Sequence, residues 1–310
     1  MRPAVSVILF TVLSGAGLGL FALLTLVQIV GSASVLTPGM HLAAGMLALV
    51  LVAAGLVSST FHLANPRNAW RALTRLRTSW LSREGVLALL FFPVALGHLA
   101  AVHLGWPGAW QTALGLAGVL LAWATLFSTG MIYACLKTIP QWNDRLVPAA
   151  YVASGHLSGA LILLAFAAAN HQATSAYVAL VLVLLALTAA VKGAYYRKFA
   201  PANAGAHSLS SAIGMTAARS KLLDAGHTHG TFLTHEFAFQ VGRERAKQLR
   251  GLFFVLSLFL PAAVIALGAR DPSVLGMTAL LCLAGLTVER WLFFAEAQHV
   301  VRLFHGQATV

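Results

Sequence analysis

Two side chains at the ends of one short polar connection have the residue types that hydrogen-bond and proton chemistry needs. His62 follows an apolar run long enough to cross a membrane, and Glu84 opens the next such run. Helices joined by a short connection run antiparallel, so both side chains are predicted to lie at one membrane depth. An imidazole and a carboxyl at the polar edge of an apolar pocket suit quinone chemistry, because one can hydrogen-bond a quinone carbonyl while protons are exchanged with water.

The connection between these two residues is rich in arginine and reads as a short surface helix. Asn65 and Pro66 are typical of a helix start, with Asn as the cap and Pro at the first helical position. Arg67, Arg71 and Arg75 follow at intervals of four residues, which predicts one stripe along a helix face. This connection is therefore the first place to expect a functional surface.

The helix after the connection is predicted to be capped by Ser82, which puts Glu84 in its first turn. A structural interpretation stays open here, because Glu84 would complement the helix dipole and His62 would only reach the interface. In the functional interpretation, nearby arginines tune the carboxylate. The candidate quinone-site and proton-exchange residues are His62, Glu84, Arg83 and Arg67.

The overall composition assigns the chain to the membrane proteins. Of its 310 residues 59% are hydrophobic and only 9% are charged, with a mean hydropathy of +0.83, which excludes a water-soluble globule. The apolar runs are continuous, as in transmembrane helices, whereas barrel strands alternate. We predict an all-α, polytopic protein with eight transmembrane helices, whose apolar runs begin near Val5, Met40, Val86, Gln111, Pro148, Ser175, Gly251 and Val274.

The distribution of positive charge predicts the orientation. Of the 20 Lys and Arg residues, only Arg270 falls on the far side of the predicted spans. Because Lys and Arg are retained on the cytoplasmic side, both termini and the basic side are predicted to be cytoplasmic, in the inner membrane of a bacterium. The same rule accounts for the net charge of +12. We therefore expect membrane lipid and an acidic protein surface as partners, and no nucleic acid.

The whole chain, residues 1–310, is predicted to form one membrane domain with two cytoplasmic, partner-facing connections, 64–85 and 195–250. The end of the second, Thr234 to Arg250, reads as an amphipathic helix, although a plain basic flank is an equal alternative. Ordinary interfacial anchoring is likewise the alternative to docking for the segment that holds Lys137. The candidate docking residues are Arg71, Arg75, Lys137, Trp142, Arg243 and Arg245.

Several other patterns are interpreted more plainly. Ser14 to Gly19 contains a GxG motif inside an apolar helix, so it predicts close helix packing and not dinucleotide binding. Glu289 and Arg290 are predicted to form a structural ion pair, with a proton path as the alternative. The cysteines and histidines lack the spacing of a metal site, so we expect no metal. Possible haem ligands are His41, His98, His103, His156 and His171.

The chain resembles the membrane-anchor family of dimethyl sulfoxide reductase, an eight-helix subunit of molybdopterin oxidoreductase complexes. The resemblance runs from end to end and is weakest over about 200–231. The segments that carry it are PAVSVILFTVLSG at Pro3 to Gly15, FHLANPRNAWRA at Phe61 to Ala72, SWLSRE at Ser79 to Glu84, IYACLKTIPQW at Ile132 to Trp142 and ERWLFFAEAQHVV at Glu289 to Val301.

This resemblance implies a three-part complex. A molybdopterin subunit would perform the substrate chemistry, a four-cluster ferredoxin-like iron–sulfur subunit would relay electrons, and this protein would anchor both and react with menaquinone or ubiquinone. In the family, a His and a Glu that flank this connection are implicated in quinol binding, and they match His62 and Glu84. The resemblance brings no haem, and none is expected. The protein would be enzymatic only as a membrane subunit, with no substrate turnover of its own.

The basic side is predicted to be cytoplasmic, which favours the branch that resembles the anchor of a cytoplasmic sulfite-oxidising enzyme, where electrons enter the quinone pool. A quinol-oxidising anchor of a dimethyl sulfoxide reductase-type complex is the main alternative. A purely structural anchor is a further one. A transporter would need ionisable residues near the middle of the membrane, and the clustering of charge at one side disfavours it.

Overall fold

The protein is a bundle of long apolar helices. The computed structural model describes residues 3–31, 37–63, 65–172, 174–200, 208–215, 220, 223 and 245–305. In these ranges, eight helices are long and apolar enough to cross a membrane, which confirms the predicted all-α class and number of spans. The spans are α1 (Val5–Val30), α2 (Pro38–Thr60), α3 (Trp80–His103), α4 (Gly108–Ala134), α5 (Leu146–Ala169), α6 (Ser175–Lys198), a composite seventh span of α10 (Ala246–Phe254), η3 (Val255–Phe259) and α11 (Leu260–Ala266), and α12 (Pro272–Ala295).

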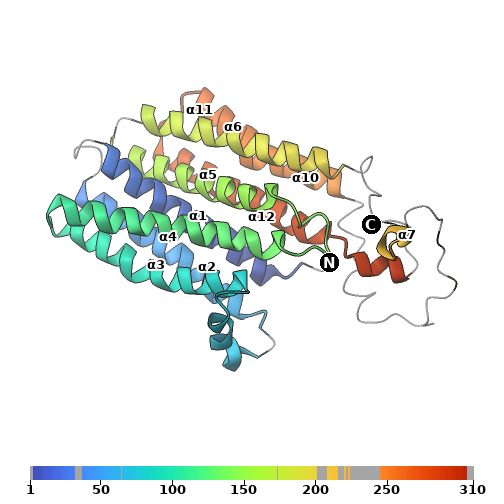
Figure 1. Ribbon diagram of the computed structural model, residues 1–310. Coiled ribbons are helices and arrows are strands. Elements are labelled where there is room, and N and C mark those ends of the chain that lie inside the picture. Colours follow the sequence, from blue (N-terminus) through green and yellow to red (C-terminus); the bar gives the residue numbers. More distant parts are fainter. Residues whose placement is uncertain are drawn as a thin grey trace.

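The first helix lies at the centre of the bundle. α1 packs against α2, α4, α5 and α12, and α5 in turn packs against α4, α6 and α12 (Figure 1). Both α1 and α5 are buried along most of their length. The other helices surround these two and leave large apolar side chains exposed, as expected for surfaces that face lipid.

Glycines allow α1 to approach its neighbours closely. A Cβ atom on Gly19 would lie 2.0 Å from the carbonyl oxygen of Gly155 in α5, and one on Gly17 would lie 2.4 Å from the carbonyl oxygen of Ala48 in α2. Backbone stands against backbone at both places, so no rotamer change would make room for a larger residue. The Ser14 to Gly19 motif therefore packs helices, as predicted.

The seventh span is not a regular α-helix. A short π-helix, η3, separates α10 from α11, and Pro261 stands at the start of α11, where its missing N–H disrupts the helical ladder. At this point the Ser257 hydroxyl donates to the Cys282 carbonyl oxygen of α12 at 3.0 Å. A Cβ on Gly285 would lie 2.2 Å from the same hydroxyl oxygen. The irregularity thus lies where the span contacts α12.

The connection after α2 contains a helix, but of a tighter kind than the spacing predicted. η1 (Pro66–Thr74) is a 3₁₀-helix, and Asn65 precedes it without a side-chain cap hydrogen bond. A 3₁₀-helix has about three residues per turn, so residues four apart point about 120° away from one another. The predicted single stripe of Arg67, Arg71 and Arg75 is therefore wrong, and these arginines, all exposed, spread around the connection.

One end of the bundle carries most of the polar structure. The start of α1, the η1 connection, the connection after α4 and the helix η4 (Val300–His305) that follows α12 lie at the same end (Figure 1). We call this the η1 end. The opposite end holds the turns after α1, α3, α5 and α11. The short helix α7 (Leu209–Ala212) contacts η4, while most of the predicted connection 195–250 lies outside the described residues.

Candidate functional site

The central residue of the candidate site is a buried carboxyl. Glu84 is only 3% exposed in α3, although it lies close to the helix start. Ser79, and not Ser82 as predicted, caps α3, because its side chain accepts the backbone N–H of Ser82 at 3.3 Å. The first turn of α3 therefore contains no acidic residue. The effect of a helix dipole falls off within one turn, so complementing it does not explain Glu84.

Glu84 instead contacts the neighbouring helix α4. The Thr129 hydroxyl hydrogen-bonds a carboxyl oxygen of Glu84 and also lies 3.0 Å from the carbonyl oxygen of Thr125. This hydroxyl has one hydrogen and two oxygen neighbours. It donates to the carboxylate when Glu84 is ionised, and it can donate to Thr125 and accept from the carboxyl O–H when Glu84 is protonated. The contact therefore satisfies both protonation states of Glu84.

Aromatic side chains lie beside this carboxyl. Trp80, one turn before Glu84 in α3, packs edge to face on Phe127 of α4, with ring centroids 5.8 Å apart. The Phe127 ring is 45% exposed on the outside of the bundle. An aromatic contact thus joins α3 and α4 one turn from Glu84 and leaves Phe127 partly exposed.

His62 lies in the turn just after α2 and is exposed. Partial removal from water lowers the pKa of its imidazole below the ordinary 6.5, and this effect exceeds the opposing hydrogen bond to the backbone of Ser59. Among the described residues, no hydrogen bond or ion pair joins His62 to Glu84. His62 follows α2 and Glu84 lies in α3, and these two helices contact each other. The joint action of the two residues on one ligand stays a prediction.

Arg83 holds the connection in shape. Its Nε donates to the Leu76 carbonyl oxygen at 2.8 Å, and its Nη2 donates to the Arg77 carbonyl oxygen at 2.8 Å. Its guanidinium also lies 4.2 Å from the ring centroid of Trp80. Arg83 therefore positions the backbone before α3, whereas Arg67 is exposed on η1, away from the buried carboxyl.

The predicted docking residues differ in their surroundings. Arg71, Arg75, Lys137 and Arg245 are exposed at the η1 end, and Arg243 lies outside the described residues. Trp142 is only 4% exposed, so it is not a surface side chain. Its indole N–H donates to the Phe293 carbonyl oxygen at 3.0 Å, and its ring stacks on that of Phe293, with centroids 5.6 Å apart. The buried indole offers little surface of its own, and the docking role of Trp142 stays a prediction.

A buried group of charges lies deeper at the same end. Lys192 of α6 forms an ion pair with Glu289 of α12, and the Nε of Arg290 lies 3.3 Å from the other oxygen of Glu289. The three side chains are at most 4% exposed. This confirms the predicted Glu289 and Arg290 pair. The sequence pattern missed Lys192, which stands six residues before the end of α6 and resembles an ordinary basic flank.

Two histidines at the opposite end form a further polar contact. The Nε2 atoms of His41 and His98 lie 3.2 Å apart, and Nδ1 of His98 lies 3.0 Å from the carbonyl oxygen of Gln111. Both imidazoles are buried. In the sequence, the nearest histidine to His98 on the same helix is His103. The structure instead pairs His98 with His41 of α2, 57 residues earlier. In the described part of the chain, no three His, Cys, Asp or Glu residues group as metal ligands.

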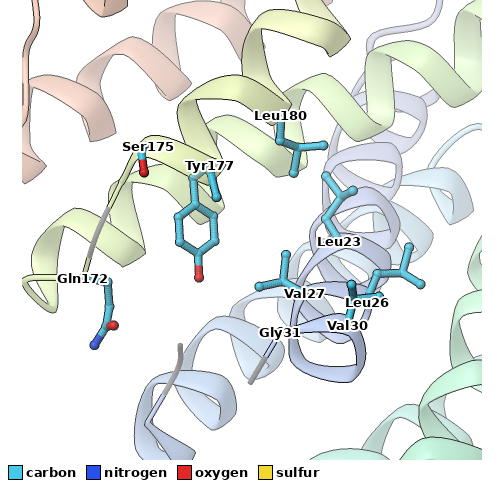
Figure 2. A pocket seen from close by; sticks show the side chains of 10 residues that line it. Leu23, Leu26, Val27, Val30, Gly31, Gln172, Ser175, Tyr177 and Leu180 are labelled. Atoms are coloured by element: carbon cyan, nitrogen blue, oxygen red, sulfur yellow. The ribbon is translucent and has the colours of Figure 1, made fainter. Parts of the chain in front are cut away.

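A large cavity also lies at the opposite end, between α1 and α6. It has a volume of about 630 Å³ and is mostly lined by apolar side chains of α1 and α6. Figure 2 shows Tyr177 projecting from α6 toward Val27 of α1. The Tyr177 hydroxyl is buried without a hydrogen-bond partner. This cavity has no acidic or basic side chain among its lining residues, so it does not compete with Glu84 as a site of proton chemistry.

Comparisons with known proteins agree with the resemblance seen in the sequence. The family model described as DMSO reductase anchor subunit (DmsC) matches residues 1–295. The protein is 30% identical over 324 aligned residues to a subunit of the sulfite dehydrogenase of Allochromatium vinosum, covering 98% of this sequence and 99% of the relative. It is 25% identical over 129 residues to a subunit of the anaerobic dimethyl sulfoxide reductase of Haemophilus influenzae, covering 40% of this sequence and 44% of the relative.

Proposed function

Because this protein belongs to the DMSO reductase anchor subunit family, we propose that it is the quinone-reactive membrane subunit of a three-subunit molybdopterin oxidoreductase. The protein is a multi-pass membrane anchor of an oxidoreductase complex. In the proposal it passes electrons between the quinone pool and a four-cluster iron–sulfur subunit, which in turn serves a molybdopterin-containing catalytic partner. Quinone or quinol is the only redox ligand assigned to the anchor itself.

The proposed direction is sulfite oxidation with quinone reduction. The full-length match to a sulfite dehydrogenase subunit supports it. In the order of the spans, all Lys and Arg residues except Arg270 fall on one side, which supports a cytoplasmic η1 end in a bacterial inner membrane. The shorter match to a dimethyl sulfoxide reductase subunit favours quinol oxidation as the second candidate. The exposed arginines of the η1 connection are proposed to dock the iron–sulfur subunit.

The quinone site is proposed to lie at Glu84, with His62 as a hydrogen-bond donor or acceptor to the quinone ring. The observation that carries this is the buried carboxyl with a partner that suits both of its protonation states. A carboxyl held in an apolar span is costly and marks a functional site by default. Quinone reduction consumes two protons with each pair of electrons, and Glu84 would supply them to the quinone oxygens.

The test is quinone-coupled turnover and quinone-analogue binding in the purified complex, comparing wild type with Glu84→Gln and His62→Ala. The matched control for the histidine is His103→Ala, which changes an exposed histidine at the opposite end of α3. We expect both site variants to lose turnover and analogue binding while the complex stays assembled, and the control to keep both. Wild-type binding and turnover in the assembled Glu84→Gln complex would refute the placement of the quinone site at Glu84 and leave this connection as a docking surface.

A further inference from the structure

We propose that a buried row of polar side chains at the η1 end carries protons between water and Glu84. The proposal rests on the proposed quinone site and adds the route by which that site exchanges protons. The row crosses the bundle from the seventh span to α3. The members that can release and take up a proton are, in order from the surface, Glu296, Lys192, Glu289, Tyr151, Tyr133 and Glu84; Arg250 and Arg290 stay charged and hold their neighbours in place.

The outer end of the row is accessible to water. Arg250 of α10 donates to Glu296, just after α12, at 2.5 Å. Their side chains are 25% and 18% exposed, whereas those of Lys192 and Glu289 are 2% and 1% exposed. Glu296 interacts electrostatically with Lys192 and Glu289. A carboxyl that faces both water and the buried charges is placed to receive a proton from outside and transfer it inward.

The middle of the row holds more charge than a structural pair requires. Glu289 has Lys192 on one carboxyl oxygen and Arg290 on the other. One cation would be enough to balance the carboxylate, and each further buried charge is costly. With two cations present, Lys192 can release or take up a proton while Arg290, which stays charged, keeps Glu289 paired. The arrangement therefore tolerates a change of protonation in its interior.

The step from α12 to α5 passes a very small polar cavity. The guanidinium of Arg290 lies 3.7 Å from the ring centroid of Tyr151. The hydroxyls of Tyr151 and Ser154 are buried without hydrogen-bond partners, and both residues line a cavity of about 10 Å³ together with Arg290. That volume is on the scale of a single water molecule, which these hydroxyls could hold. The cavity is a relay point between the ion group and the tyrosines.

The inner end of the row reaches Glu84 through two tyrosines. The rings of Tyr133 and Tyr151 stack at an angle of 23°, with centroids 5.8 Å apart. Each tyrosine lies close enough to both Glu84 and Arg290 to interact electrostatically with them. Tyr133 belongs to α4, the helix whose Thr129 contacts Glu84. Phenolic hydroxyls donate and accept hydrogen bonds, so they can hand a proton along without a net charge.

Quinone reduction balances two electrons against two protons. The iron–sulfur partner supplies the electrons, the protons come from water at the η1 end, and the quinone becomes quinol. Glu84 gives each proton to a quinone oxygen and is reprotonated through the row, with Glu296 as its outer carboxyl. In quinol oxidation the same protons leave by the same route.

The test compares Tyr151→Phe and Glu289→Gln in the purified complex. Tyr151→Phe removes one hydroxyl and keeps the ring on which Arg290 lies, so it is the cleaner variant. Its matched control is Tyr177→Phe, which removes a buried, unpartnered hydroxyl at the opposite end. We expect both row variants to lower quinone-coupled turnover by about tenfold or more, with unchanged quinone-analogue affinity. Slower proton delivery should also enlarge the effect of D₂O on turnover in Tyr151→Phe.

Wild-type turnover and an unchanged D₂O effect in Tyr151→Phe would overturn the proposed route, as would an equal loss in Tyr177→Phe. If Glu289→Gln does not assemble, Tyr151→Phe alone decides. The outcome is separate from that of the quinone site. If Glu84→Gln abolishes analogue binding while the row variants are normal, the site stands and the route fails. If Glu84→Gln is itself normal, the proposed quinone site fails, and the route that leads to it fails with it.

Discussion

Replacing Thr129 by Val tests the contact on which the proposed chemistry of Glu84 depends. Valine keeps the branched shape of the side chain and removes the hydroxyl that meets the carboxyl oxygen. Glu84 is 3% exposed, so water does not readily replace the lost donor. A hydrogen bond contributes about 1.5–3 kcal/mol to a charged group and about 0.5–1.5 kcal/mol to a neutral one. Both forms of Glu84 lose a bond in this variant, so the ionised carboxylate should be destabilised by about 1–1.5 kcal/mol more than the protonated form.

The expected result is slower proton transfer from Glu84. At about 1.4 kcal/mol per factor of ten, quinone reduction by the assembled complex should fall by about 5-fold to 10-fold if that transfer limits turnover. The assay is steady-state quinone-coupled turnover, with subunit content measured in parallel. Thr129→Ser, which restores a hydroxyl, should recover most of the rate.

Thr278→Val is the matched control for this prediction. Thr278 is 3% exposed, and its hydroxyl donates to the carbonyl oxygen four residues earlier at 2.7 Å, as Thr129 does to Thr125. Its hydroxyl meets no carboxyl, and it lies in the first half of α12, toward the opposite end of the bundle. Equal losses in Thr129→Val and Thr278→Val would indicate a general helix effect, and full activity in Thr129→Val would refute the role given to the contact.

Three further predictions concern packing, pH and the connection. Gly19→Ala places a methyl group against the backbone of α5, so we expect the free energy of unfolding to fall by about 1–3 kcal/mol and the thermal midpoint to fall with it. The control is Gly193→Ala, whose new methyl group meets nothing within 4 Å and should change the midpoint little. Equal midpoints in the two variants would contradict the packing account. Because the pKa of His62 lies below the ordinary 6.5, its imidazole should stay neutral at pH 7. Any acid-induced change in quinone-analogue affinity should therefore occur below pH 6.5 and disappear in His62→Ala. A change in affinity above pH 6.5 would count against His62 as the titrating group. Arg83→Gln removes two hydrogen bonds to the backbone of Leu76 and Arg77, so trypsin should cleave this turn faster in the assembled complex. An unchanged rate of cleavage would show that Arg83 does not hold the turn.

The sequence was sufficient for the spans, because membrane insertion depends on continuous apolar length. The predicted and observed starts agree at Val5 and Ser175 and differ by a few residues elsewhere. The sequence was less informative about how each helix is rotated about its own axis, since a helix that is apolar on every side has no preferred face in its pattern. For that reason the contact between His41 and His98 and the role of Lys192 could not be seen before the helices were placed together.

Local chemistry near helix starts was also only partly predictable. Ser79 and Ser82 are equally good caps by residue type, and the choice between them depends on where the connection ends. Similarly, arginines spaced four apart indicate a stripe only in an α-helix, and η1 is tighter. Trp142 looks like an interfacial anchor by its neighbours in sequence, but contacts from α12, about 150 residues later, bury it.

The central position of α1 has a consequence for how the protein is made. α1 precedes in the sequence every helix that covers it, and the glycines that fit against α5 have no partner until α5 has been synthesised. Until α5 is synthesised, α1 therefore has only α2 and α4 among these partners, and its contact with α12 forms last. Assembly of the bundle is thus ordered by synthesis, and a ribosome stalled before α12 would leave a nascent polypeptide that still lacks Glu289 and Arg290, so that Lys192 would have no buried ion-pair partner.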